Sequence, residues 1–219
     1  MPGGVRSVRL VGSGAFAREV TGPLRSALIG AGCGVHLGPT DNPTPGAADV
    51  ARAEAATSLG ILVADHDDPV VAGFSEAWRA AGVPSLVIVQ HHPEVRIGPF
   101  DVPGTALCAH CFRTRARQNG RGAKACGDRL PDRGPAISVD GYPPYLIAVA
   151  VALTMERLTA LDDAAEARNE ITVVNTATLV TRTFTVVPVN QCPQCDDQKP
   201  IGLLAGHQPM FPDLERVPR

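Results

Sequence analysis

Two cysteine pairs constrain this chain more than any other feature of its sequence. Both have the spacing C-x-x-C, in Cys108-Ala-His-Cys111 and Cys192-Pro-Gln-Cys195, and 80 residues separate the pairs. Four thiolates neutralise a divalent cation and match the tetrahedral geometry that zinc prefers. A self-contained zinc ribbon has a much shorter gap between its two pairs, so this chain does not form an isolated ribbon. The four cysteines together instead predict a structural zinc site within a larger fold. Such a site joins two distant segments of one fold and stabilises that fold directly.

The sequence also leaves other interpretations of the cysteines open. Two independent redox pairs would each need a helix start in a thioredoxin-like unit, and neither context is indicated here. Four cysteines also suit an iron–sulfur cluster. His110 is a further candidate ligand, although its place beside Cys111 favours a solvated histidine. Four thiolates leave no open coordination position, so a structural metal is expected. Cys33 is expected to be a core thiol, and Cys126 an exposed one.

Composition narrows the class of protein. The 219 residues suit one domain with a small appendage, and 44% hydrophobic residues are enough for a core. The net charge of −2 argues against a general nucleic-acid binder. No secretory signal is visible, and the longest apolar stretch, Tyr145–Leu153, is far below the roughly 20 residues that span a bilayer. The sequence therefore predicts a cytoplasmic protein, where paired C-x-x-C motifs favour metal over disulfides.

The N-terminal part of the chain predicts a strand, a glycine turn and a helix. Residues 5–11 alternate apolar and polar side chains, Gly12-x-Gly14 follows, and apolar residues then recur at helical spacing. This order is typical of the opening of a dinucleotide-type βα unit.

The remaining chain alternates strand and helix patterns. Together they predict an α/β fold: a Rossmann-like, mostly parallel sheet with helices on both faces and an antiparallel C-terminal hairpin. Residues 1–201 are expected to form one domain, followed by an irregular tail over 202–219. The expected strands are 33–37, 59–64, 85–90 and 95–100, the last at an edge, with 171–176 and 179–188 as the hairpin. The expected helices are 48–56, 69–81 and 143–161, with loops at 38–47 and a basic loop or loose helix at 113–133.

The glycine turn is a candidate nucleotide site. Gly12 and Gly14 would let phosphate oxygens approach the start of the following helix. The confirming acid belongs at the end of the second strand, but the first acid there, Asp41, is displaced past Gly38. A plain tight turn is therefore favoured, and Gly12, Gly14, Asp41 and Asp65 are the candidates for a vestigial site for ATP and Mg²⁺.

Acids also follow the strand at 59–64. Asp65, Asp67 and Asp68 lie at the carboxyl end of a predicted parallel strand, where they would suit Mg²⁺. Capping of the helix that begins at Pro69 is the favoured interpretation. His91-His92 follows the next strand and is expected to be exposed. No Ser–His–Asp pattern or nucleophile elbow occurs, so no catalytic residue is assigned.

One segment resembles a known family. The run Ile97-Gly98-Pro99-Phe100-x-x-Pro103-Gly104-x-x-x-Cys108-x-x-Cys111, with Arg113 close behind, resembles the ThiF-like cyclodehydratase C-proteins of thiazole/oxazole-modified microcin pathways. These proteins, also called Ocin-ThiF-like, belong to the ThiF/MoeB activating-enzyme superfamily. Their second cysteine pair follows a helix and a terminal hairpin, as the pair at 192–195 does here. The resemblance covers roughly residues 5 to 196.

The resemblance implies a role in making azole- or azoline-modified ribosomal peptides. Such proteins support a YcaO enzyme, which uses ATP to cyclise Cys, Ser or Thr side chains onto the backbone. The ThiF-like member generally binds the leader peptide through an added N-terminal element and does not adenylate. We expect that element to be absent here, so the precursor peptide would bind directly or through a separate leader-binding protein. The superfamily also implies homodimerisation.

Departures from the superfamily decide between the candidate functions. The only lysines are Lys124 and Lys199, so adenylation would lack its expected cation. The favoured function is a non-catalytic scaffold, with an ATP-dependent adenylating enzyme acting on a peptide or carrier carboxylate as the alternative. A nicotinamide or flavin oxidoreductase is disfavoured by the missing acid. The basic segment at 113–133 would suit an acidic leader peptide or partner, against a merely solvated loop.

Overall fold

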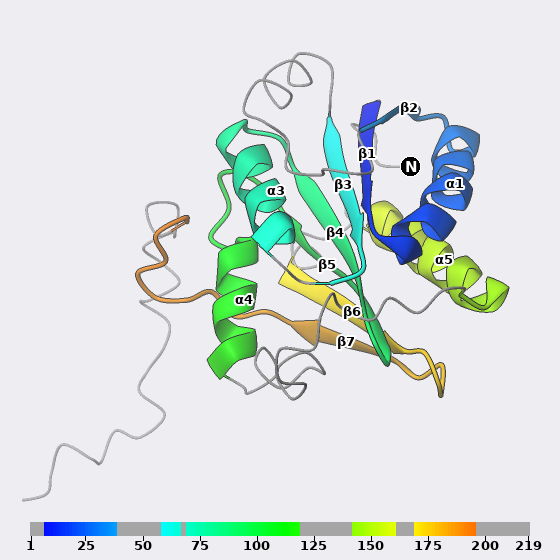
Figure 1. Cartoon of the computed structure of the whole chain (residues 1–219). Helices are drawn as coiled ribbons and strands as arrows, with labels where there is room; N and C mark the ends of the chain where they lie inside the picture. The colour runs from blue at the N-terminus through cyan, green and yellow to red at the C-terminus, as the bar shows by residue number, and fades with distance from the viewer. Residues whose placement is uncertain (1–6, 39–57, 67–68, 119–141, 161–168, 196–219) are drawn as a thin grey trace, which may run out of the picture.

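The computed structural model describes residues 7–38, 58–66, 69–118, 142–160 and 169–195, which form a seven-stranded sheet with helices on both faces (Figure 1). The strands are β1 (Ser7–Ser13), β2 (Gly34–Leu37), β3 (Leu59–Ala64), β4 (Ser85–His91), β5 (Glu94–Asp101), β6 (Glu170–Asn175) and β7 (Thr181–Thr185). The helices are α1 (Ala15–Gly30), α3 (Pro69–Ala80), α4 (Ala109–Gln118) and α5 (Pro144–Ala160). The predicted α/β class is confirmed.

The sheet is mixed, and its order is β2-β1-β3-β4-β5-β6-β7. Strands β2, β1, β3 and β4 pair in parallel, whereas β4–β5, β5–β6 and β6–β7 pair antiparallel. All six residues of β3 and the first six of β4 are buried, because helices cover both faces of these parallel strands. The chain passes from β1 outward to β2 and then crosses to β3, so the topological switch point lies between β1 and β3.

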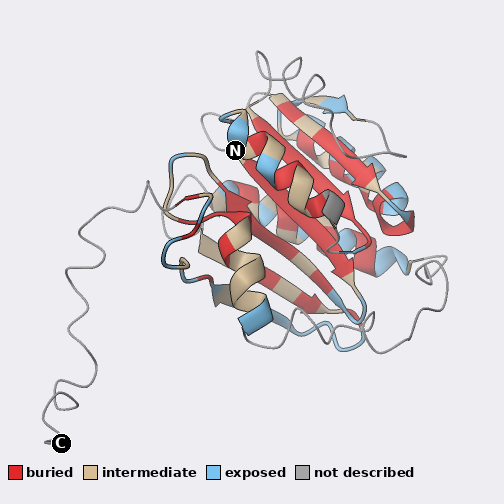
Figure 2. Cartoon of the chain, turned by 60° about the vertical axis from the view of Figure 1, so that its left-hand side comes forward, coloured by how far each residue is buried: buried red, intermediate tan, exposed pale blue. Residues whose placement is uncertain are grey.

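Two hydrophobic layers hold the helices to the sheet (Figure 2). On one face α1 and α5 pack together over the central strands, and Phe16 meets Tyr142 edge to face at 5.1 Å between ring centroids. On the other face α3 packs through Phe74 and Trp78. Gly60 in β3 is needed there, because a Cβ would lie 2.9 Å from the indole of Trp78.

The structure corrects one expectation and decides between the two alternatives of another. The segment 95–100 is no edge strand, because β5 lies between β4 and β6. The basic segment from 113, predicted as a loop or a loose helix, is helical as far as Gln118, since Ala109–Gln118 forms α4. Helix α5 buries Leu146, Ile147, Ala150, Thr154 and Leu158, whereas Ala148 is exposed.

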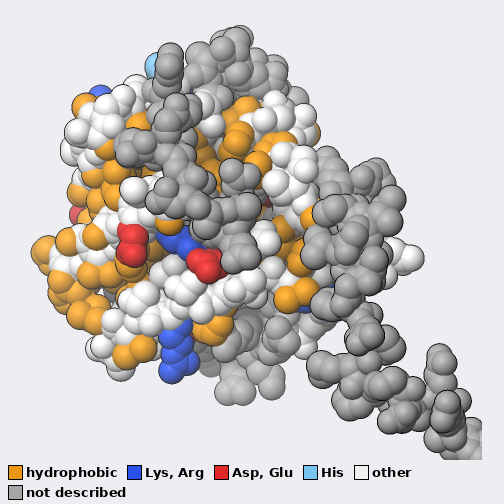
Figure 3. Space-filling model, turned by 180° about the vertical axis from the view of Figure 1, so that it is seen from behind, with side chains coloured by type: hydrophobic (Ala, Val, Ile, Leu, Met, Phe, Trp, Pro, Cys, Tyr) orange, Lys and Arg blue, Asp and Glu red, His pale blue; other side chains and the backbone are white. Residues whose placement is uncertain are grey.

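Several expectations fall outside the described residues: the loop over 39–47, the helix over 48–56, the basic stretch beyond 118 and the tail over 202–219. Within the described part, no helix is long and apolar enough to cross a membrane. The outer face of α5 nevertheless carries apolar side chains, of which Tyr145 is half exposed. Seen from behind, hydrophobic side chains gather on the side where α1 and α5 lie (Figure 3). Homodimerisation stays a prediction.

A bulge in β5 explains the Gly-Pro motif of the sequence. The pairing of β4 with β5 shifts register between Leu86 and Ile88, opposite Gly98 and Pro99. Gly98 adopts φ +101°, and a Cβ there would lie 3.0 Å from the Glu170 carbonyl oxygen of β6. Only glycine combines this backbone conformation with so close a neighbouring strand. Beyond the bulge, Asp101 at the end of β5 accepts a hydrogen bond from the Ala109 amide at the start of α4.

We therefore expect Gly98→Ala to lower the free energy of unfolding by about 2 kcal/mol, through backbone strain and strand contact. Urea unfolding followed by circular dichroism measures the change. The matched control is Gly73→Ala in α3, where a Cβ meets nothing within 4 Å and helix propensity should raise stability by about 0.5–1 kcal/mol. Equal stability of the Gly98→Ala variant and the parent chain would contradict this account of the bulge.

Candidate metal centre and the glycine turn

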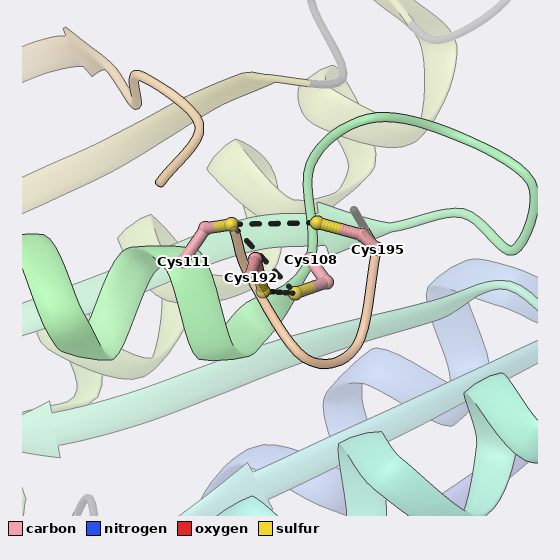
Figure 4. Close-up of side chains that lie close together, drawn as sticks. All are labelled: Cys108, Cys111, Cys192 and Cys195. Carbon is pink, nitrogen blue, oxygen red and sulfur yellow. Dashed lines mark hydrogen bonds between the residues drawn. The ribbon is translucent and has the colours of Figure 1, made fainter. Parts of the chain in front are cut away.

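The four cysteines of the two pairs converge on one point (Figure 4). Cys108 and Cys111 come from the start of α4, and Cys192 and Cys195 come from the turn after β7. All four side chains are buried, with relative exposures between 0% and 2%. Their sulfur atoms lie within 4.8 Å of one another, so they are able to hold a single metal ion.

The sulfur spacing fits a tetrahedral thiolate site. A Zn–S bond of about 2.3 Å places neighbouring sulfurs at about 3.8 Å on the edges of the tetrahedron. The observed separations are 3.9 Å between Cys108 and Cys111, 3.6 Å between Cys108 and Cys192, and 3.5 Å between Cys111 and Cys195. The prediction that distant chain segments would meet at these residues is confirmed, and His110 is not part of the group.

The electrostatics of the cluster favour a buried thiolate. The hydrogen bond with the Cys108 thiol, above all, lowers the pKa of Cys111 to about 4, and the same hydrogen bond raises the pKa of Cys108. Burial raises the pKa of Cys195 to about 12. The amide of Val189 also donates to the Cys111 sulfur at 3.4 Å. A divalent cation would replace the remaining thiol protons and offset half of the negative charge on the four sulfurs.

The helical position of the first pair differs from expectation. Cys108 directly precedes α4 and Cys111 lies in its first turn, so this pair does occupy a helix start. A helix start by itself also suits a redox pair, because the helix dipole stabilises a thiolate. The second pair, however, packs its sulfurs directly on the first. This contact joins the four cysteines into one group and argues against two independent redox sites.

Cys33, the fifth cysteine that the structure describes, lies elsewhere. It is buried in the core beneath α1, and desolvation raises the pKa of its thiol. The prediction of a core thiol is therefore confirmed. Cys126 lies outside the described residues.

Arg79 connects the segments that carry the cysteines. Its guanidinium leaves the last turn of α3 and forms a buried ion pair with Asp101 at the end of β5. Its Nε donates to the carbonyl of Gln194, between Cys192 and Cys195, at 3.2 Å. Further bonds go to three carbonyls of the loop before α4, those of Val102, Thr105 and Leu107.

Asp101 in turn fixes the start of α4. Its Oδ2 accepts a hydrogen bond from the Ala109 amide at 2.9 Å, which satisfies a free N–H at the helix N-terminus. Burial raises the pKa of Asp101, while the Ala109 amide and the Arg79 charge oppose that rise. One carboxylate thereby holds both Arg79 and the helix that carries Cys111.

A second set of contacts holds the turn after β7. Glu76 of α3 accepts hydrogen bonds from Gln194 at 2.8 Å and from Arg113 of α4 at 3.2 Å. Arg115 of α4 donates to the backbone carbonyls of Val187 and Pro188, at 3.2 and 2.7 Å. Arg113 and Arg115 of the basic segment therefore hold the fold together. A charge reversal at Arg115 would disturb these contacts as well as any binding of an acidic partner.

Sequence reasoning missed Arg79, Asp101 and Glu76. Arg79 has the appearance of an ordinary basic residue in the last turn of a helix. Asp101 directly follows the Gly98-Pro99-Phe100 motif, and this position was the one feature of the sequence that could have indicated a role for it. The roles of all three depend on contacts between segments that lie more than 20 residues apart.

The structure brings together three of the four residues named for nucleotide binding. Gly12 lies near the end of β1 and pairs with Val63 of β3, Gly14 precedes α1, and Asp65 follows β3. The carboxylate of Asp65 accepts hydrogen bonds from the amides of Ala15 and Phe16, at 2.7 and 2.9 Å. Asp65 therefore caps α1, which corrects the expectation that it caps the helix beginning at Pro69. Asp41, Asp67 and Asp68 lie outside the described residues.

Gly14 is required by this arrangement. It has φ +93°, and a Cβ at this position would lie 2.3 Å from the Asp65 carboxyl carbon. The carboxylate thus sits against the glycine turn, at the switch point between β1 and β3. Ligands of open α/β sheets bind at such switch points, and a phosphate would use the same two amides.

The fold and the site together define a class: a Rossmann-like α/β domain whose antiparallel end is joined by a buried four-cysteine cluster. Solved structures with this fold include "Heterocyclase in complex with substrate and Cofactor", with a TM-score of 0.60 and 19% identity over 89% of this chain and 26% of that one. The E. coli microcin synthetase McbBCD complex matches with a TM-score of 0.59 and 14% identity, over 88% of this chain and 69% of that one. E. coli MccB with MccA matches with a TM-score of 0.57 and 12% identity, over 87% and 66%.

These similarities establish the fold. The resemblance to ThiF-like proteins of azole-modified peptide biosynthesis is thereby confirmed at the level of the fold. The chain spans about a quarter of the length of the heterocyclases that it matches. No protein-family model matches the sequence, and no curated protein matches it either.

Arg79 gives the sharpest test of how the site is held together. Arg79→Met should lower the free energy of unfolding by about 3–5 kcal/mol, because it leaves the Asp101 carboxylate buried without its charged partner. Arg117→Met, on the exposed side of α4, is the control and should change stability by less than about 0.5 kcal/mol. Chemical denaturation measures both variants. Equal effects of the two substitutions would show that Arg79 does not hold the site.

Proposed function

We propose that this chain is a non-catalytic ThiF-like component in the biosynthesis of azole- or azoline-modified ribosomal peptides, where it supports a YcaO cyclodehydratase. The similar solved structures are a heterocyclase, a microcin synthetase complex and MccB. The similarity to these proteins supports a role in peptide modification. The Gly98–Cys111 motif of the sequence supports the same assignment.

The observation that carries the non-catalytic role is the position of Asp65. In a nucleotide-binding Rossmann domain, the amides at the start of the first helix bind phosphate. Here the Ala15 and Phe16 amides already donate to Asp65, and its negative charge would repel a phosphate at the same place. The described residues contain no lysine that would neutralise a triphosphate. Support of a partner enzyme therefore fits this chain better than adenylation.

The four-cysteine cluster is proposed to bind one structural zinc ion. Four sulfurs with tetrahedral spacing fit zinc and leave no position open for a substrate. The ion would close a loop of 80 residues between the pairs. The conformational entropy lost on closing a loop of this length corresponds to a free energy of roughly 4 kcal/mol. The antiparallel end of the sheet would then depend on the metal.

We expect one zinc ion per chain by inductively coupled plasma mass spectrometry, and a loss of most of it in Cys111→Ser, because one thiolate ligand disappears. Thermal unfolding should occur at a lower temperature after chelation and in this variant. Cys33→Ser is the matched control, since Cys33 is a buried cysteine outside the cluster. Full zinc content in Cys111→Ser, or its loss in Cys33→Ser, would contradict the assignment.

The non-catalytic role predicts no ATP binding. Isothermal titration of the zinc-loaded chain with millimolar ATP and Mg²⁺ should give no binding heat, whereas co-expression should recover the chain together with a YcaO enzyme and raise its cyclisation rate. One-to-one ATP binding that disappears in Asp65→Asn would instead favour an adenylating enzyme. Heterocycle formation by the chain without its partner would overturn the scaffold role.

A further inference from the structure

Strand β7 forms one edge of the sheet, with β6 as its only neighbour among the described residues. Four of its five residues are exposed, and Phe184 is half-buried. Exposed apolar side chains flank the strand at both ends: Leu179 and Val180 before it, and Val187 after it. Edge strands of this kind are templates for adding another strand, unless charge, proline or covering structure prevents it.

The register of the β6–β7 ladder shows which backbone groups face outward. The Asn175 amide donates to the Val180 carbonyl at 3.0 Å, and the Val186 amide donates to the Asn169 carbonyl at 2.7 Å. Hydrogen-bonded pairs alternate along an antiparallel ladder, so even-numbered residues of β7 bond to β6. The amides and carbonyls of Thr181, Thr183 and Thr185 therefore point away from the sheet.

The surroundings of this edge are basic on the face where α4 lies. Arg182 lies opposite Val173, which packs in the same cluster as Phe112 of α4. Arg115 of α4 bonds to the backbone just after β7, and Arg117 is exposed further along the helix. β7 itself contains no acidic residue. A second copy of this edge would bring another Arg182, and like charges disfavour that pairing.

We propose that β7 binds an extended, acidic segment of the precursor peptide by strand addition. The peptide would pair antiparallel or parallel with the outward groups of Thr181, Thr183 and Thr185, cover the apolar side chains at the ends of the strand, and place its acids near Arg182. Main-chain hydrogen bonds would supply affinity, and charge would supply selectivity. This inference rests on the proposed function and names the site at which that function would engage its substrate.

Thr183→Pro tests the site, because proline removes one outward N–H and its ring obstructs an incoming strand. The substitution leaves the β6 ladder intact, since the Thr183 amide does not bond to β6. Thr183→Ala is the matched control, because it loses the side chain and keeps the amide. The probe is a fluorescein-labelled synthetic leader segment of the precursor peptide, titrated into the chain in complex with its YcaO enzyme and followed by anisotropy.

We expect Thr183→Pro to weaken binding about tenfold or more, and Thr183→Ala to change it by less than about threefold. Weakening of the same order by a peptide whose acids are replaced with amides would support the charge selectivity. Binding to Thr183→Pro as tight as to the parent complex would overturn the site, and so would the absence of any peptide binding to the parent complex. In either case, co-purification with the enzyme and stimulation of its cyclisation rate test the proposed function separately.

Hydrogen exchange measured by NMR on the unaltered chain removes any dependence on the folding of a variant. The amides of Thr181, Thr183 and Thr185 should exchange quickly in the free chain and become protected when the peptide binds. The amides of Arg182 and Phe184 should be protected in both states, because they belong to the β6 ladder. Protection that appears elsewhere and leaves these three amides unchanged would overturn the proposal.

Discussion

The contact between four buried thiols is the interaction on which the antiparallel half of this structure depends. Cys108 and Cys111 arrive from the end of β5 and the start of α4, whereas the other two sulfurs arrive from beyond β7. A buried cluster of this kind favours one thiolate and leaves negative charge in a place that water does not reach. A divalent cation would stabilise that negative charge. Folding of this region and metal binding would therefore occur together.

Two carboxylates serve the same physical purpose at opposite ends of the fold. Asp65 caps α1 from the end of β3, and Asp101 caps α4 from the end of β5. Each supplies negative charge to the positive end of a helix and satisfies amides that would otherwise lack partners. At α4 this capping orients the helix that presents Cys111. At α1 it takes the place where a nucleotide phosphate would bind in a related fold.

These two features are the basis of the proposed role in assembly, in place of chemistry within this chain. A metal site closed by four sulfurs would leave no position for a substrate, and the Ala15 and Phe16 amides at the switch point already donate to Asp65. Among the described residues, exposed apolar side chains lie on α5, at Tyr145, and beside both ends of β7, at Leu179, Val180 and Val187. Under the proposed function, these surfaces are where a partner enzyme or a peptide would bind.

The sequence by itself determined the features that depend on local pattern. Alternation, glycine turns and buried runs located most strands, and the C-x-x-C spacing identified the residues that meet in the cluster, because ligand chemistry restricts residue type strongly. Tertiary structure alone decided the rest. Helix α5 is apolar on nearly all sides, so its periodicity did not reveal the buried face, and β5 has the same composition whether it lies at an edge or inside the sheet. Asp65 and Arg79 acquire their roles from partners that lie 49 and 115 residues away in the sequence, and no local pattern records such a contact.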